Sequence, residues 1–511
     1  MKVCLLAAGK GTRNSSVKGL HKALLPLENK PAISHIIDKI PASTDIIVAV
    51  GYKSNQIKTY LNEVYPDRNI IFVEVDNYDR QGSGPGYSLL CCESYLNEPF
   101  VFTSIDTIIE ESYPYIECNY DWVGSSTIDK EESGKYCLIQ KSNQGNTLYY
   151  GEGNLAYIGI AGVYNYEKFW KALRNQKLLK DEYQVINGFE NLKLETIECT
   201  WYDIGNNDSY HKAKKVFNRD VVANKNNEAL FIDNNKVVKF FDDTNRIKQR
   251  LDRVRYLPTT KINSINENMY SYEYVNGELL SNVYDERIID SLFSYLSNNL
   301  YNHTGIKDDE FIKNCRLMYE EKTKIRLKPL VDSELDKIEY INGVKVDPIE
   351  KLIADIDFEE IYRLAIPVHF HGDLQPENII YSNEKSFTLI DWRESFGSSI
   401  EYGDLYYDLS KLYHGLLING GNILEGHYDY EVSSNCASVK FLIKNNLYEL
   451  RNSLKNFCEY YDYSWKNVRL LGIIHYLNIC NLYTEYNNNK YGNFLFLYGK
   501  YLLTKWRNND T

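Results

Sequence analysis

The stretch that decides the fold of the first part of the chain is KVCLLAAGKGTR, Lys2 to Arg13. Its apolar beginning predicts a short buried strand, and two glycines follow directly. Gly9 and Gly11 let the backbone approach a ligand closely, with N–H groups facing a bound triphosphate. Lys10 and Arg13 would neutralise its charge. The Walker A order G-x-x-x-x-G-K-[ST] is absent, so we expect a phosphate-binding turn of another kind.

Strand and helix patterns alternate over the first 110 residues. The remaining expected strands are DIIVAVG (45–51), NIIFVEV (69–75) and PFVFTSID (99–106). The expected helices are PAISHIIDKI (31–40), SNQIKTYLNEV (54–64), with Ser54 as its cap, and GYSLLCCESYL (86–96). Such alternation predicts a mostly parallel sheet with helices on both faces. A ligand should then lie beyond the carboxyl ends of the strands.

Two carboxylates fall at strand ends in this part of the chain. Asp106 ends FTSID, and Asp203 follows a strand in TWYDIGNNDSYHKA. Either one alone would be a helix cap or a turn residue. Together they provide what a Mg²⁺-assisted attack on the α-phosphate of a nucleoside triphosphate needs. Lys22, in HKALLPLENKPAI, supplies a nearby cation.

These motifs together resemble the sugar-nucleotide pyrophosphorylase family, including bacterial phosphocholine cytidylyltransferases, over roughly residues 1–218. The resemblance implies that Lys22 and Arg13 are catalytic and that Asp106 and Asp203 hold the metal. It places RQGSGPGYSLL (80–90) at the base-recognition loop and YIGIAGVYNYEKFW (157–170) at a strand beside the substrate. The implied nucleotide-binding residues are Ala8, Gly9, Lys10, Gly11, Thr12, Gln81 and Gly82.

A second motif, HGDLQPENIIYS, lies at 371–382. Its spacing matches H-x-D-L-x-x-x-N of kinase catalytic loops, and the apolar strand FTLIDW then ends near Asp391. In that chemistry Asp373 orients and deprotonates the attacking hydroxyl, while Asn378 and Asp391 hold Mg²⁺ on ATP. Upstream, Lys239 in KVVKFF could reach the α- and β-phosphates. Each residue alone could merely cap a turn, but the joint spacing favours catalysis.

Residues 223–511 resemble the aminoglycoside phosphotransferase and choline kinase superfamily. The loop reads HGD, and IDW stands where protein kinases have DFG. The segment at 269–280 resembles the hinge between lobes. In YGDLYYDLSKL (402–412), Asp404 or Asp408 would steady the catalytic loop. Two features depart from the pattern, since no G-x-G-x-x-G loop is evident and RIKQRLDRVRYL (246–257) offers Asp252 but no glutamate for Lys239.

The sequence therefore predicts an α/β protein with a Rossmann-like nucleotidyltransferase domain and a two-lobed kinase-like α+β phosphotransferase domain. The polar run NRDVVANKNNEAL and a new strand pair with Asn234–Asn235 at its turn set the boundary. We expect domains at 1–222 and 223–511, with an N-lobe at about 223–278 and a C-lobe at about 279–511.

The composition of the 511 residues narrows the function classes. A net charge of −12 argues against a nucleic-acid partner. The ten cysteines are scattered without a CxxC pair, which argues against a cysteine metal site and for a reducing compartment. No apolar run of about eighteen residues is present, so we expect no membrane span. A cytoplasmic enzyme follows as the expectation, with a homo-oligomer left open.

The two halves together predict a bifunctional enzyme. One half would phosphorylate a small alcohol or sugar with ATP, and the other would activate the phosphate with a second nucleotide, CTP by preference, for surface polysaccharides such as capsules. Trp392, Tyr402, Tyr406 and Tyr407 could form an aromatic cage for a quaternary amine. The alternatives are a sugar 1-kinase paired with UTP or GTP transfer, and one silent half used as a binding module. A protein kinase is disfavoured because no A-P-E segment follows Asp391.

Overall fold

The computed structural model describes residues 1–11, 16–142, 145–175, 182–217, 227–283, 285–382, 386–417, 426–483 and 489–508. The chain forms two compact units. The first contains residues 1–243 and 263–272, and the second contains residues 244–262 and 273–511. The predicted boundary near residue 222 falls outside the described residues. The units separate later, after Asp243.

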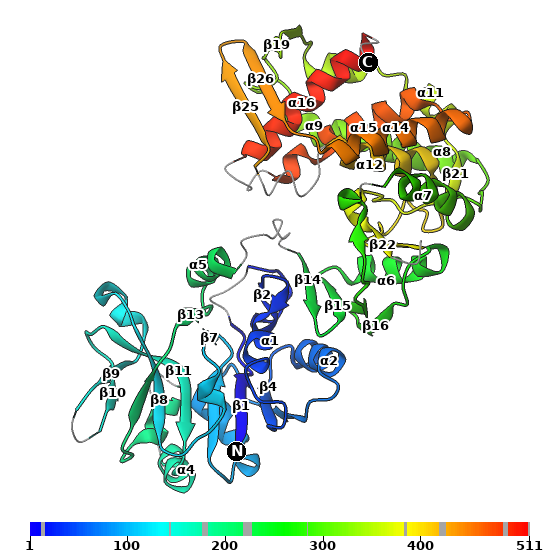
Figure 1. Cartoon of the computed structure of the whole chain (residues 1–511). Helices are drawn as coiled ribbons and strands as arrows, with labels where there is room; N and C mark the ends of the chain where they lie inside the picture. The colour runs from blue at the N-terminus through cyan, green and yellow to red at the C-terminus, as the bar shows by residue number, and fades with distance from the viewer. Residues whose placement is uncertain are drawn as a thin grey trace. The chain divides into compact units, whose positions relative to one another are not determined.

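The first unit is built on a mixed sheet, which has nine strands in its described part (Figure 1). Four strands run parallel in the order β6-β1-β4-β5, which are Phe100–Ser104, Lys2–Ala7, Ile46–Val50 and Ile70–Glu74. The long strand β11, Leu155–Val163, then pairs antiparallel with β6. The others are β8 (Trp122–Thr127), β9 (Leu138–Gln140), β10 (Thr147–Tyr149) and β12 (Glu195–Glu198). The parallel part places the carboxyl ends of four strands on one edge.

Helices cover both faces of this sheet, as predicted. Alternate residues of β1 point to opposite faces. Val3 and Leu5 pack in a core with α1 (Ala32–Ile37) and α2 (Ser54–Val64). Cys4 and Leu6 pack with α3 (Pro85–Cys91) and α4 (Tyr166–Arg174). One local prediction is wrong, because α2 begins at Ser54 itself and its N-cap is Lys53, in a left-handed conformation with φ of 47° and no side-chain cap.

A four-stranded sheet, predicted as the kinase-like N-lobe, belongs mainly to the first unit. Its order is β14-β15-β17-β16, which are Glu228–Asp233, Lys236–Phe241, Met269–Glu273 and Asn263–Asn266. Phe231 and Phe240 join the apolar core of α1 and α2. Tyr60 and Tyr65 each donate a hydrogen bond of 3.1 Å to the Asp233 carboxylate. These contacts bind the sheet to the first unit, whereas α6, Thr244–Arg253, belongs to the second.

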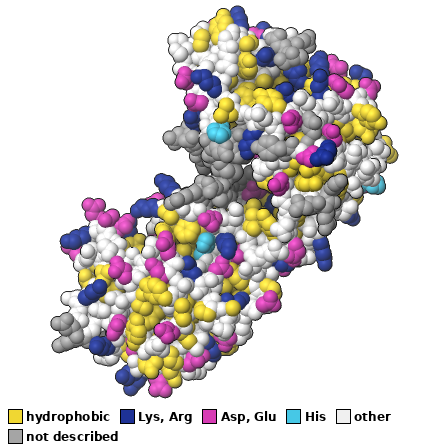
Figure 2. Space-filling view, viewed as in Figure 1, with side chains coloured by type: hydrophobic (Ala, Val, Ile, Leu, Met, Phe, Trp, Pro, Cys, Tyr) yellow, Lys and Arg dark blue, Asp and Glu magenta, His cyan; other side chains and the backbone are white. Residues whose placement is uncertain are grey.

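The remaining elements of the first unit carry its strand-end loops. Strands β7 (Thr107–Ile109) and β13 (Trp201–Asp203) pair antiparallel, and β2 (Pro26–Leu27) pairs with β3 (Lys30–Pro31). Helix α5 spans Asn207–Phe217. On the face shown in Figure 2, Lys and Arg side chains are interspersed with Asp and Glu.

The second unit is largely helical, as the sequence predicts from about residue 285. Its longer helices are α7 (Glu286–Asn299), α8 (Asp309–Arg316), α12 (Leu405–Leu417), α14 (Asn445–Tyr460), α15 (Trp465–Ile479) and α16 (Lys490–Arg507), and the shorter ones are α9 (Lys322–Leu327), α10 (Ile349–Ala354) and α11 (Phe358–Leu364). Within the described residues, no helix is both long and apolar enough to span a membrane.

Short strands of the second unit carry the loop around Asp373. They form the sets β18-β22-β23 (Glu278–Leu279, Ile379–Ser382, Ser386–Leu389), β21-β24 (Pro367–His369, Tyr402–Asp404) and β20-β19-β26-β25 (Val344–Lys345, Tyr340–Ile341, Cys436–Phe441, Tyr428–Ser433). The predicted catalytic loop runs between β21 and β22. Asp391 follows β23 with a φ of 58°, an uncommon conformation for a residue other than glycine.

Candidate active sites

The two predicted strand-end carboxylates of the first unit lie together. Asp203 ends β13 opposite Thr107 of β7, and the Ile204 N–H donates to the Asp106 carbonyl at 3.1 Å. A Cβ added to Gly205 would stand 3.0 Å from Asp203 Oδ1 and 3.3 Å from Asp106 Oδ2. Both carboxylates therefore border one small space that glycine leaves open.

Lys22 joins these carboxylates to the glycine turn. Its Nζ lies 3.1 Å from Asp106 Oδ2. A Cβ on Gly11, whose φ is 63°, would stand only 2.8 Å from Lys22 Cδ, so a larger residue at position 11 would displace the lysine. Tyr136 donates a hydrogen bond of 3.0 Å to Asp203 Oδ2. No motif in the sequence identifies Tyr136, which lies in a loop far from Asp203 along the chain.

A buried histidine, His21, forms a hydrogen bond to the backbone of the glycine turn. His21 Nδ1 accepts the Ala23 N–H at 3.0 Å, so its proton is on Nε2, which donates to the Gly9 carbonyl at 3.2 Å. Burial lowers the pKa of His21 to about 3, and the ring is neutral. The backbone N–H of His21 donates a hydrogen bond of 2.9 Å to Gln56 Oε1. No motif in the sequence marks His21 as part of the site.

The predicted base-recognition segment borders the glycine turn at its start. Lys10 Nζ lies 2.5 Å from Asp79 Oδ2. Ala8 accepts the Tyr52 N–H through its carbonyl at 2.9 Å. Two further predicted residues follow Asp79: the Gln81 carbonyl accepts a hydrogen bond of 3.1 Å from Asn77, and Gly82 has a φ of 82°. Thr12 and Arg13 lie outside the described residues.

In the second unit, Asp373 is an ionised carboxylate with polar side chains around it. Lys411 Nζ lies 3.1 Å from its Oδ1, and Gln375 Nε2 donates to the same atom at 2.9 Å. Burial by itself raises the pKa of Asp373, but Lys411 and Gln375 bring it down to about 2. Asn378 donates to the Asp373 carbonyl at 2.8 Å, which closes the loop between the two predicted residues.

His371 and Asp408 support this loop from within the core. His371 Nδ1 accepts the Asp373 N–H at 3.3 Å, and its Nε2 donates to the Ile390 carbonyl at 2.9 Å. Burial lowers the pKa of His371 to about 4. The Asp408 carboxylate accepts the N–H groups of His371 and Gly372, both at 2.6 Å. Of the two acidic residues left open by the sequence, Asp408 contacts the catalytic loop.

The other acidic residue, Asp404, has a different role. Its carboxylate accepts the Tyr319 hydroxyl at 2.6 Å and the backbone N–H groups of Ile366 and Tyr406 at 2.8 and 3.2 Å. Burial raises the pKa of Asp404 to about 6. Asp404 therefore joins β24 and the start of α12 to the helices beneath them.

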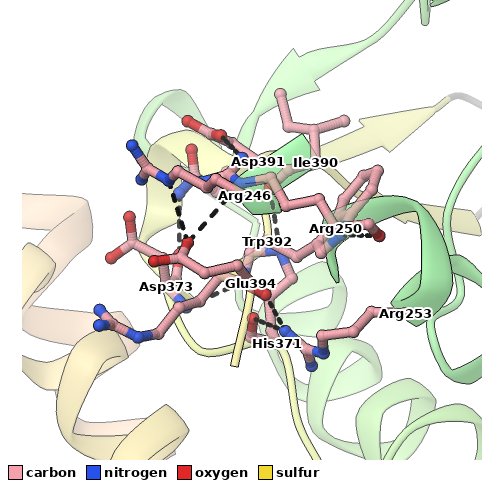
Figure 3. A network of polar contacts seen from close by, with 11 residues as sticks. Arg246, Arg250, Arg253, His371, Asp373, Ile390, Asp391, Trp392 and Glu394 are labelled. Atoms are coloured by element: carbon pink, nitrogen blue, oxygen red, sulfur yellow. Dashed lines mark hydrogen bonds and ion pairs between the residues drawn. The ribbon is translucent and has the colours of Figure 1, made fainter. Parts of the chain in front are cut away.

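Helix α6 presents arginines to the predicted metal-binding loop (Figure 3). Arg250 is buried, and its Nη1 lies 2.8 Å from Asp391 Oδ1. Arg246 Nε lies 3.3 Å from Glu394 Oε2. The helix in which the sequence offered no glutamate for Lys239 thus presents basic residues to Asp391. Lys239 itself is buried on β15 of the first unit, and its pairing with this site stays a prediction.

Arg253, one turn further along α6, is completely buried. Its guanidinium stacks on the Phe370 ring, 3.9 Å from the ring centroid, and its hydrogen-bond acceptors among the described residues are carbonyl groups of the surrounding loops. The acceptors are the carbonyls of Phe370, His371, Arg393 and Ile400. The spacing of Arg246, Arg250 and Arg253 places all three on one helix face, and this spacing is visible in the sequence.

Three of the four rings of the predicted aromatic cage are buried, and the fourth, Tyr402, is half-buried with its ring against that of His369. Trp392 is buried, and its indole N–H donates to the Arg250 carbonyl at 3.0 Å. Tyr406 is buried, and its hydroxyl accepts the Ser464 N–H at 2.9 Å. Tyr407 is buried among other rings, including that of His475. Side chains that fill the core cannot also surround a ligand, so these rings act in packing.

The donor atoms near both sites suit Mg²⁺. Among the described residues, no group of three or more His, Cys, Asp and Glu side chains could hold a metal by itself. Asp106 and Asp203 border one space, and Asn378 and Asp391 flank the same loop end. Mg²⁺ is commonly bound by one or two protein oxygens and completed by substrate phosphates and water. Both pairs fit that requirement.

Comparison with known proteins agrees with the architecture of the first unit. Residues 3–113 match the MobA-like NTP transferase domain. The first unit has a nucleotidyltransferase fold. The bifunctional protein GlmU of Methanocaldococcus jannaschii is 25% identical over 216 residues, which are 40% of this chain and 51% of that protein. GlmU of Methanococcus maripaludis strain C5 is 30% identical over 135 residues, which are 26% and 31%. The chain thus spans about a third to a half of these relatives.

Solved structures match a similar share of the chain. The CTP:phosphocholine cytidylyltransferase LicC from Streptococcus pneumoniae is 20% identical, with a TM-score of 0.36, and covers 42% of this chain and 98% of its own. A UDP-glucose pyrophosphorylase in complex with UDP-glucose is 21% identical, with a TM-score of 0.37, and covers 43% and 99%.

Proposed function

We propose that the first unit is a nucleotidyltransferase that joins the nucleoside monophosphate part of an NTP to the phosphate of a small metabolite and releases pyrophosphate. The observation that carries this proposal is the meeting of Gly11, Lys22, Asp106 and Asp203 at the carboxyl ends of the sheet. The match of residues 3–113 to NTP transferase domains supports it.

In this proposal the residues of the first unit divide the work. The backbone of Gly9 and Gly11 receives the triphosphate, and Arg13 and Lys22 neutralise phosphate charge. A phosphate oxygen of the metabolite attacks the α-phosphorus, and the bond to pyrophosphate breaks. Asp106 and Asp203 would hold Mg²⁺, which when bound reduces the repulsion between two anionic reactants. Tyr136 orients Asp203 through its hydrogen bond.

For the second unit we propose a small-molecule phosphotransferase. The hydroxyl oxygen of an acceptor attacks the γ-phosphorus of ATP, the bond to ADP breaks, and the hydroxyl proton passes to Asp373. The ionised state of Asp373 supports this role, since an ionised carboxylate can accept that hydrogen bond. Asn378 and Asp391 would hold Mg²⁺, and Lys239 would contact the ATP phosphates.

The two reactions would then be consecutive, because the phosphate ester made by the second unit is the kind of nucleophile that the first unit consumes. CTP with a phosphorylated alcohol is our first choice of nucleotide and substrate. UTP or GTP with a sugar 1-phosphate is the second. Either product would be an activated building block for surface polysaccharides.

The test is to supply the full chain with ATP, each of the four NTPs and a panel of alcohols, sugars and their phosphates, while measuring ADP and pyrophosphate. Asp373→Asn should stop the alcohol-dependent release of ADP and leave pyrophosphate release from a supplied phosphate ester intact. Loss of both activities in a folded variant would show that the units are not chemically independent. ADP release that never depends on an added acceptor would leave the second unit as a binding module.

A further inference from the structure

Four basic side chains gather around the Tyr407 phenol in the second unit, and two of them, Arg393 and Lys411, also act on Asp373. We call them the basic cluster: Lys322 and Arg326 from α9, Arg393 from the loop after β23, and Lys411 from α12. Lys322 and Arg326 are one helical turn apart and share a face. Helices α9 and α12 both pack against α15, which brings the cluster together from segments distant in sequence.

Lys322 has no carboxylate partner among the described residues. No hydrogen-bond acceptor in that part of the chain contacts its ammonium group, and the largest electrostatic influence on it is the Tyr407 phenol, which the positive charges of Arg393, Arg326 and Lys411 oppose. Burial lowers the pKa of Lys322 to about 8. Lys322 is half-buried, and a partly desolvated ammonium without a counter-ion is costly, so such groups occur mainly where a ligand supplies the missing charge.

The neighbours do not neutralise the cluster. Arg326 Nη1 donates to the Asn478 carbonyl at 2.6 Å, and Arg393 Nε donates to the Ser395 carbonyl at 3.0 Å, so these contacts provide dipoles and no negative charge. Asp373 supplies one carboxylate, which pairs with Lys411 at 3.1 Å. Glu394 acts on Arg393 from the side of α6.

The pKa of Tyr407 reflects the positive charges around it. Burial raises the pKa of this phenol, but Lys322, Arg393 and Lys411 bring it down to about 8. Tyr407 and Lys411 are also one turn apart, so the phenol lies on the face of α12 that carries the lysine bound to Asp373. An excess of positive charge therefore surrounds the carboxylate that we assign to the acceptor hydroxyl.

We propose that the basic cluster binds an anionic group of the phosphoryl acceptor, a carboxylate or a phosphate, while the acceptor hydroxyl lies at Asp373. This inference rests on the proposed phosphotransferase function. The hydroxyl oxygen forms the new bond to the γ-phosphorus, ADP leaves, the proton passes to Asp373, and the anionic group remains unchanged. A quaternary amine, which the aromatic residues near Asp391 suggested as one possible acceptor, would be repelled by the cluster.

The experiment compares acceptors matched in size and opposite in charge, using the full chain with ATP. Glycerol 3-phosphate and D-glycerate are the anionic acceptors, glycerol is neutral, and choline is cationic. We expect phosphorylation of the anionic acceptors in preference to the others. Lys322→Ala should raise the KM for the anionic acceptor roughly ten- to hundredfold, as for loss of a charged hydrogen bond, and leave the KM for ATP unchanged. Lys324→Ala is the matched control, because Lys324 lies on α9 but is exposed and paired with Glu320.

A binding measurement separates this inference from the proposed function. Inorganic phosphate should protect the full chain against thermal unfolding, and Lys322→Glu should reduce that protection while Lys324→Glu does not. If this difference appears but no acceptor is phosphorylated, the anion site stands and the phosphotransferase proposal fails. Preferred phosphorylation of glycerol or choline, with no effect of Lys322→Ala, would overturn the inference and leave the phosphotransferase intact. A Lys322→Ala variant that changes the KM for ATP alone would assign the cluster to the nucleotide.

Discussion

Both units hold a loop that we assign to phosphate chemistry with a buried neutral histidine. His21 in the first unit and His371 in the second use the same atoms, since Nδ1 accepts a backbone N–H two residues later and Nε2 donates to a distant carbonyl. In each case the second contact ties the loop to another strand end or turn. The same local support is possible in both units because a neutral imidazole offers one hydrogen-bond donor and one acceptor.

The units differ in what surrounds that histidine. In the first unit, the carboxylates are positioned by the ladder between β7 and β13, and the hydrogen bonds of that ladder are backbone bonds. In the second unit, the loop rests on buried charges, with Asp408 beneath it and Arg253 beside it. A buried charge that loses its partner is far more costly than a lost neutral contact. The second site should therefore be the more sensitive to changes outside its reacting residues.

The largest effect should come from removing a reacting carboxylate, which tests whether the two sites are independent. Asp106→Ala should lower nucleotidyl transfer roughly a hundred- to ten-thousandfold, because the metal loses a ligand, and leave acceptor-dependent ADP release unchanged. Pyrophosphate release and ADP release measured on one preparation provide the test. Asp208→Ala, an exposed residue on α5, is the control. Near-normal pyrophosphate release by the Asp106 variant would refute the assignment.

The next effect concerns the charged support of the second unit. Arg253→Met should destabilise the chain by about 3–5 kcal/mol, because four carbonyls and the field around Asp408 lose a buried cation. Hydrogen–deuterium exchange should show the loss in peptides around residues 370–400 and spare those of the nine-stranded sheet. Arg255→Met, at an exposed position two residues further on, should change stability by less than about 0.5 kcal/mol. Equal loss of protection in both units would contradict the contrast drawn here.

Acidification should probe what the two histidines share. The pKa of His371 is about 4 in the folded chain, below the unfolded value of about 6.5, so the folded state binds fewer protons between these values. Its contribution to stability is present above pH 6.5 and is lost as the pH falls toward 4, by on the order of 3 kcal/mol. Asp408, whose pKa burial raises to about 7, acts in the opposite sense.

The contribution of His371 to the pH dependence of stability is therefore obtained by comparing the wild type with His371→Asn. The free energy of unfolding of each is measured by urea denaturation at pH 7 and pH 4.5. We expect the variant to be less dependent on pH than the wild type. The same comparison for His21, whose pKa is about 3, should give a difference of the same sign. A variant with an unchanged pH slope would mean that the imidazole is already protonated in the folded chain.

The smallest effect should come from filling the space between the two carboxylates of the first unit. Gly205→Ala adds a methyl group 3.0 Å from Asp203 Oδ1 and 3.3 Å from Asp106 Oδ2. We expect nucleotidyl transfer to fall about tenfold, less than the hundredfold typical of a 1 Å misplacement, with the fold retained. Gly134→Ala, where an added methyl group meets no atom within 4 Å, is the control. Full activity of the Gly205 variant would show that the two carboxylates do not share a ligand.

Sequence patterns predicted the parallel part of the first sheet and the loop around Asp373 because the residues that form each of them are close together along the chain. The strand KVCLLA and the turn at Gly9 are neighbours along the chain, as are Asp373 and Asn378. The hairpin at Asn234–Asn235 was equally local, and both residues have the positive φ that such a turn requires. These predictions needed only propensity, periodicity and turn chemistry.

Contacts between distant segments could not be predicted in the same way. Tyr136 reaches Asp203 across 67 residues, and Lys411 reaches Asp373 from a helix that follows the loop. The predicted role of Trp392 and Tyr406 in an aromatic cage was wrong for the same reason. Both are close to the site in sequence, but their side chains are buried in the core. Charge at a site depends on which helices pack together, and the sequence shows only which charges exist.

What the sequence by itself determined is therefore the chemistry available to each unit: a glycine turn with strand-end carboxylates in one, and a carboxylate–amide loop in the other. The tertiary structure decided which side chains share a space. The four-stranded sheet predicted as the N-lobe belongs mainly to the first unit, because Phe231 and Phe240 on its apolar face pack on the core of α1 and α2. The tertiary structure also gathered Lys322, Arg326, Arg393 and Lys411 around Tyr407, next to Asp373, because helix packing brings together faces that periodicity defines but cannot pair.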